Sequence, residues 1–323
     1  MGTNSTYYFG PPGPPRNPEF PAVWIEWQER YGRNNADWFD AHGYDYFTRE
    51  EFDAFYPGYG DSWPGLHGSI SATYEESSVR GLVVERRDDT TKTYRESVLR
   101  SFVASLATAE TTARNREDAL RRLLDYRRSA IAEAENGGVR EFVLEPRRDP
   151  WRARRLARLV AFQGIEVAEL TADSEANPSV SPHGGGESVE RAFPSGSFVV
   201  RLDQPAKRLA ASLLSKHVEM DAEFVDEQRR LESRREPLDI YDMTAWSLPL
   251  LFGVDCYETG AFTEGPRRSV VVESLDEPEI DPSRFADGEA PRVAWIVPGD
   301  STATAVALSL IHISLPTTLP RCR

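Results

Sequence analysis

The chain has 323 residues, 40% of them hydrophobic, which is enough for two or three domains with sizeable cores. Its 52 acidic residues outnumber its 38 basic ones, and the net charge of −14 argues against nucleic acid and anionic membrane surfaces as partners. No apolar run is long enough to span a bilayer, and only two cysteines, far apart, give no disulfide framework.

The first part of the chain predicts short elements around one alternating segment. Short helices are expected at residues 21–32 and 48–55. Residues 69–75 then alternate small polar and apolar side chains with period two, which predicts a half-buried strand. Glu75 ends this strand on its polar face, at the edge where open α/β sheets bind ligands. It is either a solvated strand-end residue or a functional carboxylate.

A long helix is predicted next, at residues 93–136. Thr93 and Glu96 have the spacing of a capping box at its start, and apolar residues recur at helical intervals along its length. Gly137 and Gly138 follow as a stop signal. We expect the first half of this helix to pack on the domain that precedes it.

The pattern then changes to strand, helix, strand. Residues 139–144 and 164–170 predict strands, and Asp149-Pro150 predicts the start of the helix between them. This order is typical of a βαβ unit with parallel strands. A Ser-, Pro- and Gly-rich connector is expected at residues 173–196.

The last third of the chain predicts one more unit of this kind. Residues 293–297 indicate a buried strand that leads into another helix. Residues 137–309 are therefore expected to form a small, incomplete parallel α/β domain, flavodoxin- or glutamine-amidotransferase-like in outline. Residues 310–323 show no periodicity, and we interpret them as an artefactual tail, with a short natural apolar tail as the alternative.

Two segments have a more specific character. Residues 56–64 read Tyr-Pro-Gly-Tyr-Gly-Asp-Ser-Trp-Pro, and residues 73–75 read Thr-Tyr-Glu. Together they resemble the carboxyl-terminal third of the catalytic domain of zinc metallocarboxypeptidases of the carboxypeptidase A-like family. Residues 1–9 are similar to the segment just after that family's third zinc ligand. The resemblance covers roughly residues 1–120, and continues more loosely to about residue 255.

The resemblance implies a fold and roles for three residues. Residues 1–92 would be the remnant of a mixed peptidase sheet with helices, on which the helix 93–136 packs. Glu75 matches the family's catalytic glutamate, which takes a proton from zinc-bound water and passes it to the leaving amine. Tyr56 matches the mobile tyrosine that closes over the carboxyl-terminal residue of the substrate, and Tyr59 competes for this assignment.

The zinc ligands that the family uses are missing from the sequence. No histidine is followed by glutamate three residues later, so the family's His-x-x-Glu pair is absent and we expect no metal ligand in this chain. Each histidine is interpreted as a surface or packing residue. The histidines are His42, His67, His183, His217 and His312.

We therefore expect a fragment, inactive alone, of a longer zinc carboxypeptidase that trims peptides or cell-wall peptides. Met1 is then an internal methionine, Zn²⁺ belongs to the parent protein, and the resemblance favours a secreted or periplasmic location for that parent. The alternative is a non-catalytic accessory module whose aromatic loop recognises a peptide or a glycan. The oligomeric state stays open.

Overall fold

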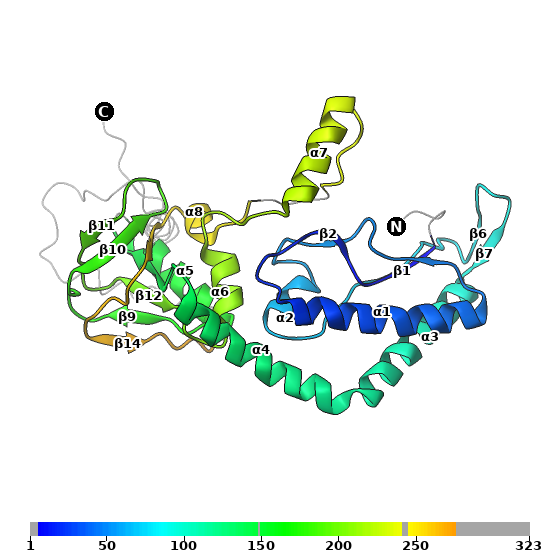
Figure 1. Ribbon diagram of the computed structural model, residues 1–323, viewed down its shortest axis with the longest axis horizontal. Coiled ribbons are helices and arrows are strands. Elements are labelled where there is room, and N and C mark those ends of the chain that lie inside the picture. Colours follow the sequence, from blue (N-terminus) through cyan, green and yellow to red (C-terminus); the bar gives the residue numbers. More distant parts are fainter. Residues whose placement is uncertain (1–5, 148, 241–244, 276–323) are drawn as a thin grey trace, which may run out of the picture. The chain divides into compact units, whose positions relative to one another are not determined.

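The computed structural model describes residues 6–147, 149–240 and 245–275, and these residues form two compact units (Figure 1). The first unit comprises the described residues up to Asn136 together with those between Asp203 and Ser247. The second comprises Gly137–Leu202 and the described residues from Leu248 on. The predicted segment 137–309 is therefore not continuous in space, because residues 203–247 fold with the first unit. The predicted strand at 293–297 and the tail 310–323 lie outside the described residues.

The first unit contains a small mixed sheet. Its strands are β1 (Tyr7–Phe9), β3 (Tyr46–Phe47) and β5 (Tyr74–Glu76), in the order β3-β1-β5. Strand β1 runs parallel to β3 and antiparallel to β5. The strand predicted at residues 69–75 is thus shorter and shifted, and Glu75 is its middle residue rather than its end. Only this stretch pairs with β1, because β1 itself has three residues.

The first unit also contains two separate strand pairs. Strand β2 (Gly13–Arg16) runs parallel to β4 (Asp53–Ala54), and β6 (Val83–Glu85) forms a hairpin with β7 (Thr91–Thr93). The helix predicted at residues 48–55 is wrong. Arg49 and Glu51 have φ values of 61° and 63°, which a right-handed helix excludes, and the chain enters β4 instead.

Two long helices cover the sheet. Helix α1 (Ala22–His42) packs on α3 (Tyr94–Arg114), and buried side chains of both enclose an aromatic core with β1. Helix α1 runs ten residues beyond the predicted end at residue 32. Gly32 lies inside this helix and is not a stop signal. A glycine is needed here for packing, because a Cβ would collide with the Gly10 carbonyl oxygen. The core residues are Tyr7, Phe9, Phe39, Val103 and Ala104.

The helix predicted at residues 93–136 is two helices. The Thr93–Glu96 capping box is confirmed, since each side chain bonds the other's backbone nitrogen. Helix α3 ends at Arg114, Asn115 leaves helical geometry with φ −116° and ψ 20°, and α4 (Arg116–Asn136) follows. The sequence places no glycine or proline at this break, so the pattern did not reveal it.

The remaining helices of this unit are α2 (Ser62–Leu66), α6 (Lys207–Leu214) and α7 (Ala222–Arg234). Arg208 explains why α6 belongs here. Its guanidinium is buried, donates to the Tyr126 carbonyl oxygen at 2.7 Å and to Ser129 Oγ at 2.9 Å, and pairs with Glu133. All three partners lie on α4, so α6 packs on the first unit.

The second unit is built on a seven-stranded sheet in the order β11-β10-β13-β8-β12-β9-β14. Every described pairing in it is antiparallel, so the predicted parallel sheet is wrong. The strands are β8 (Glu141–Glu145), β9 (Ala168–Leu170), β10 (Asn177–Pro182), β11 (Val189–Arg191), β12 (Phe198–Arg201), β13 (Asp255–Thr259) and β14 (Arg267–Ser269).

The predicted βαβ unit exists in a split form. Helix α5 (Pro150–Phe162) joins β8 to β9, and these two strands run in the same direction because each is antiparallel to β12. Strand β12 comes later in the sequence and lies between them. The predicted helix start is confirmed: Asp149 accepts hydrogen bonds from the backbone nitrogens of Trp151 and Arg152. Helix α8 (Leu248–Phe252) packs against α5.

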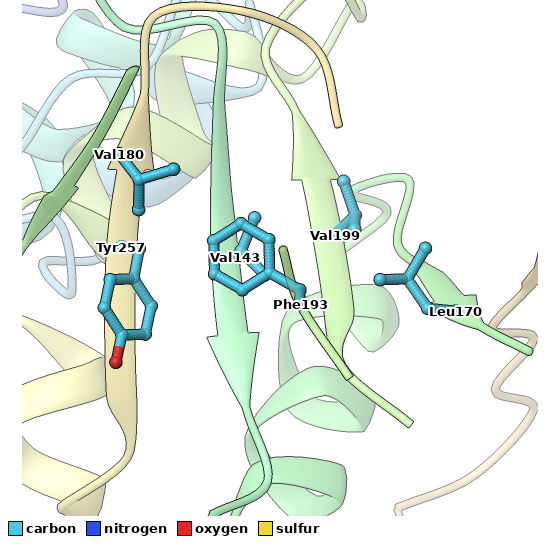
Figure 2. Packing of buried hydrophobic residues seen from close by; sticks show 6 residues of the cluster. All are labelled: Val143, Leu170, Val180, Phe193, Val199 and Tyr257. Carbon is cyan, nitrogen blue, oxygen red and sulfur yellow. The ribbon is translucent and has the colours of Figure 1, made fainter. Parts of the chain in front are cut away.

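The segment 173–196 was predicted as a connector, but it contains β10 and β11. Its buried residues join the core of the sheet, which explains the difference. Figure 2 shows this core, where the Phe193 ring lies among side chains from several strands. The residues drawn are Val143, Leu170, Val180, Phe193, Val199 and Tyr257.

Among the helices that the structure describes, none combines the length and the apolar character needed to cross a lipid bilayer.

Phe193 provides a test of this second core. It is fully buried, so Phe193→Ala should lower the free energy of unfolding by about 3–5 kcal/mol through lost burial and a cavity. Val189→Ala, at an exposed site on β11, should change it by less than about 0.5 kcal/mol. Urea unfolding measures both, and hydrogen exchange of the β8 amides localises the loss. Equal stability of the two variants would contradict this assignment of the core.

Candidate functional site

Glu75 lies between two residues whose side chains are fixed to the rest of the first unit. On one side of it, Tyr74 Oη lies 2.6 Å from Thr108 Oγ1 and accepts from Asn35 Nδ2 at 3.2 Å, which joins β5 to α3 and α1. Side chains alternate along a strand, so Glu75 points to the other face of the sheet. Its side chain is half-buried.

On the other side, Glu76 forms a buried ion pair with Lys92 of β7. Lys92 is 3% exposed, and it also donates to the Ser77 hydroxyl and, at 3.1 Å, to the Ser77 carbonyl oxygen. Burial lowers the pKa of the Lys92 ammonium, and the bond to Glu76 opposes this effect. The interactions of Lys92 thus fix the chain immediately after Glu75.

The face that carries Glu75 also carries Tyr8, whose ring packs against Phe47 and Phe52. Tyr8 is the register partner of Glu75 in β1, and paired residues stand on the same face. Tyr8 is 1% exposed, and burial raises the pKa of its phenol. Asp61 and Asp53 raise this pKa further, whereas Arg16 lowers it, so all three charged groups act on the phenol. Glu75 therefore shares its face with a neutral, buried phenol.

The loop before β5 is bound to the segment that leads into Glu75. Asp61 Oδ2 accepts from Thr73 Oγ1 at 2.8 Å, and the Asp61 carbonyl oxygen accepts from Ser71 Oγ at 2.5 Å. Gln28 Nε2 of α1 donates to the Ser71 carbonyl oxygen at 2.5 Å. These bonds fix residues 71–73 without a regular strand ladder.

Tyr56 and Tyr59 form an aromatic group with Trp246. The Tyr56 ring meets the Tyr59 ring edge-on at 5.3 Å between centroids, and the Trp246 ring at 5.7 Å. Trp246 is buried, and its Nε1 donates to the Ser212 carbonyl oxygen at 2.7 Å. Gly58 lies beneath the Tyr56 ring, where a Cβ would come within 2.6 Å of the ring. Both tyrosine side chains are half-buried.

In the part of the chain that the structure describes, no three His, Cys, Asp or Glu side chains are grouped so that they could hold a metal ion. His42 stacks on Trp38, His67 meets Trp63 edge-on, and His217 is exposed. His183 is buried in the second unit, with Nε2 at 3.2 Å from Glu258 Oε1 and 3.6 Å from Cys256 Sγ. His312 lies outside the described residues.

Glu75, Tyr56 and Tyr59 are site residues predicted from the sequence, whereas the residues that fix them were not predicted. Alternation in residues 69–75 predicts Thr73 on the same face as Glu75, but the sequence gives no sign of the bond between Thr73 and Asp61, which lies in the Gly- and Pro-rich loop. Lys92 carried no signal, because a lysine between two threonines is typical of an exposed edge strand.

No family model matches the chain, and neither the curated proteins nor the solved structures give a match.

The Lys92–Glu76 pair should be sensitive to removal of one partner. Lys92→Met leaves a carboxylate without its cation in a largely buried place, so the free energy of unfolding should fall by about 3–5 kcal/mol. Lys92→Met combined with Glu76→Leu should recover much of this loss, because both charges are gone.

The matched control is Arg229→Met, which breaks the exposed pair with Asp226 and should cost less than about 0.5 kcal/mol. Chemical unfolding of the variants measures these differences. If Lys92→Met is as stable as Arg229→Met, the buried pair does not hold β5.

Proposed function

We propose that Glu75 is the general base of a carboxypeptidase-type hydrolysis and that this chain supplies the part of the site that carries the base. Two lines of reasoning support this proposal. Residues 56–64 and 73–75 resemble the corresponding family segments. The observation that carries it is the placement of Glu75, half-buried between Tyr74 and Glu76, whose own side chains are anchored elsewhere.

In the proposed reaction, Glu75 moves one proton. It accepts this proton from a water molecule as the water oxygen forms a bond to the scissile carbonyl carbon. The bond between that carbon and the amide nitrogen then breaks, and Glu75 passes the proton to the leaving nitrogen. One water is consumed, and one carboxyl-terminal amino acid is released. A glutamate held by its neighbours can do this without reorganising the strand.

Tyr56 or Tyr59 is proposed to cover the carboxyl-terminal residue of the substrate. The two rings contact each other, and Tyr56 also rests on the buried Trp246 ring, so either hydroxyl can be presented from an ordered aromatic support. Loss of one such hydroxyl should cost about 1 kcal/mol of substrate interaction, much less than loss of the base.

The zinc ion that the resemblance implies would need ligands from outside the described residues. The proposal therefore assigns to this chain the base and the aromatic cover alone.

The decisive test replaces Glu75 in the longest protein whose reading frame contains this sequence, after zinc supplementation. Glu75→Gln is nearly isosteric but cannot accept the proton, so kcat on a peptide with a free carboxyl terminus should fall roughly 10²- to 10⁴-fold with KM little changed. Glu85→Gln makes the same charge change at an exposed position of β6 and should leave kcat unchanged. Near-normal kcat in the Glu75→Gln protein would show that this carboxylate is structural.

A second candidate is a binding module that recognises a peptide or glycan without cleaving it. The observation that favours it is the half-buried aromatic group of Tyr56 and Tyr59 on Trp246, a common arrangement for stacking on a ligand. The two candidates differ in turnover. Binding that is abolished by Tyr56→Ala, in a wild-type protein without any turnover, would favour the module.

A further inference from the structure

A cavity of about 430 Å³ in the first unit is lined by residues 63–70 and by one side of α4. Its walls are largely apolar, with Trp63, Ile70 and Leu123 among them. None of its nine lining residues is acidic, although the chain as a whole carries a net charge of −14. The cavity is thus a locally cationic and apolar place in an acidic protein.

Arg122 of α4 lines this cavity, and only one of its three guanidinium nitrogens has a hydrogen-bond partner among the described residues. The side chain is 5% exposed, and its Nη1 donates to the Gly68 carbonyl oxygen at 2.7 Å. Nε and Nη2 are buried and have no hydrogen-bond partner within the described residues. The titratable groups that act on this guanidinium are Tyr126, Tyr31 and Arg208, none of which is a carboxylate. Arginine stays charged, and no described carboxylate forms an ion pair with this buried cation.

His67 lines the same cavity and adds a second polar atom. Its Nε2 is buried and has no hydrogen-bond partner in the described part of the chain. Burial lowers the pKa of the imidazole, and the nearby Arg127 lowers it further, so the ring is neutral at pH 7. A neutral imidazole can donate one hydrogen bond to an anion without adding a charge.

We propose that this cavity binds a small monoanionic carboxylic acid with an apolar body. The carboxylate bonds Arg122 through Nε and Nη2, the planar fork that matches two carboxylate oxygens. The apolar body lies against Trp63, Ile70 and Leu123. One fixed positive charge beside a neutral imidazole suits a monoanion, whereas a phosphate dianion would need a second cation in the wall.

Leu123 lines the cavity beside Arg122. Its side chain is half-buried and lies close to Gly68, the residue to which Arg122 is bonded. Because Nε and Nη2 are buried, the proposed binding requires a side chain of the cavity wall to move, and Leu123 is proposed to be that side chain. The site is separate from Glu75, and the inference does not rest on the proposed function.

Calorimetric titration of the chain with phenylacetate tests this inference. The wild-type protein should bind phenylacetate saturably, and phenylacetamide and acetate should each bind at least roughly tenfold more weakly, because one lacks the charge and the other the apolar body. Arg122→Met should weaken phenylacetate binding roughly ten- to hundredfold. Arg121→Met, at an exposed neighbouring arginine of α4, is the matched control and should leave binding unchanged.

Ala119→Leu covers the case in which Arg122→Met does not fold. It narrows the cavity while leaving Arg122 in place, and it should also weaken phenylacetate binding. The inference is overturned if phenylacetate shows no saturable binding up to ~10 mM. It is also overturned if acetate or phenylacetamide binds as well as phenylacetate, or if folded Arg122→Met or Ala119→Leu protein binds normally.

Discussion

The side chains on either side of Glu75 fix its position, and the arrangement of the first unit around β5 depends on them. Tyr74 bonds to both long helices, and Glu76 pairs with Lys92, which the hairpin of β6 and β7 brings beneath the strand. A three-residue edge strand has too few ladder bonds to hold a side chain precisely. The buried ion pair and the tyrosine hydrogen bonds provide the missing constraints, and the Glu75 side chain between them stands on the opposite face of the sheet.

Three cationic side chains are buried in this unit, and they differ in how many of their nitrogen atoms have a hydrogen-bond or ion-pair partner. Lys92 and Arg208 each have a carboxylate and further acceptors, so their burial is compensated within the fold. Arg122 has one carbonyl acceptor and two buried nitrogens without partners in the described part of the chain. The three residues differ in their bonding partners and not in their burial, because all three side chains are almost fully buried. An anion from solution would provide Arg122 with a negatively charged partner, as Glu76 does for Lys92 and Glu133 does for Arg208.

Local signals were predictable from the sequence, and long-range pairings were not. The capping residues Thr93 and Asp149 were recognisable because their partners lie within three residues. The position of β12 between β8 and β9 could not be predicted. The residue pattern of a strand does not show which strands pair with it, and the sequence order suggested that β8 and β9 pair directly. The same holds at the site. A resemblance and an alternating pattern point to Glu75, but Lys92 lies 16 residues after its partner Glu76, in a segment whose sequence is typical of an exposed strand.

We propose that Glu75 is the base of a hydrolytic site whose zinc ligands would come from outside the described residues. The most direct measurement is the sequence of the transcript on the 5′ side of the codon for Met1. The account predicts an open reading frame that continues upstream, with a His-x-x-Glu pair and a further histidine shortly before Met1. A stop codon directly upstream, or a continuous frame without these residues, would contradict the peptidase assignment and leave Glu75 as a structural carboxylate.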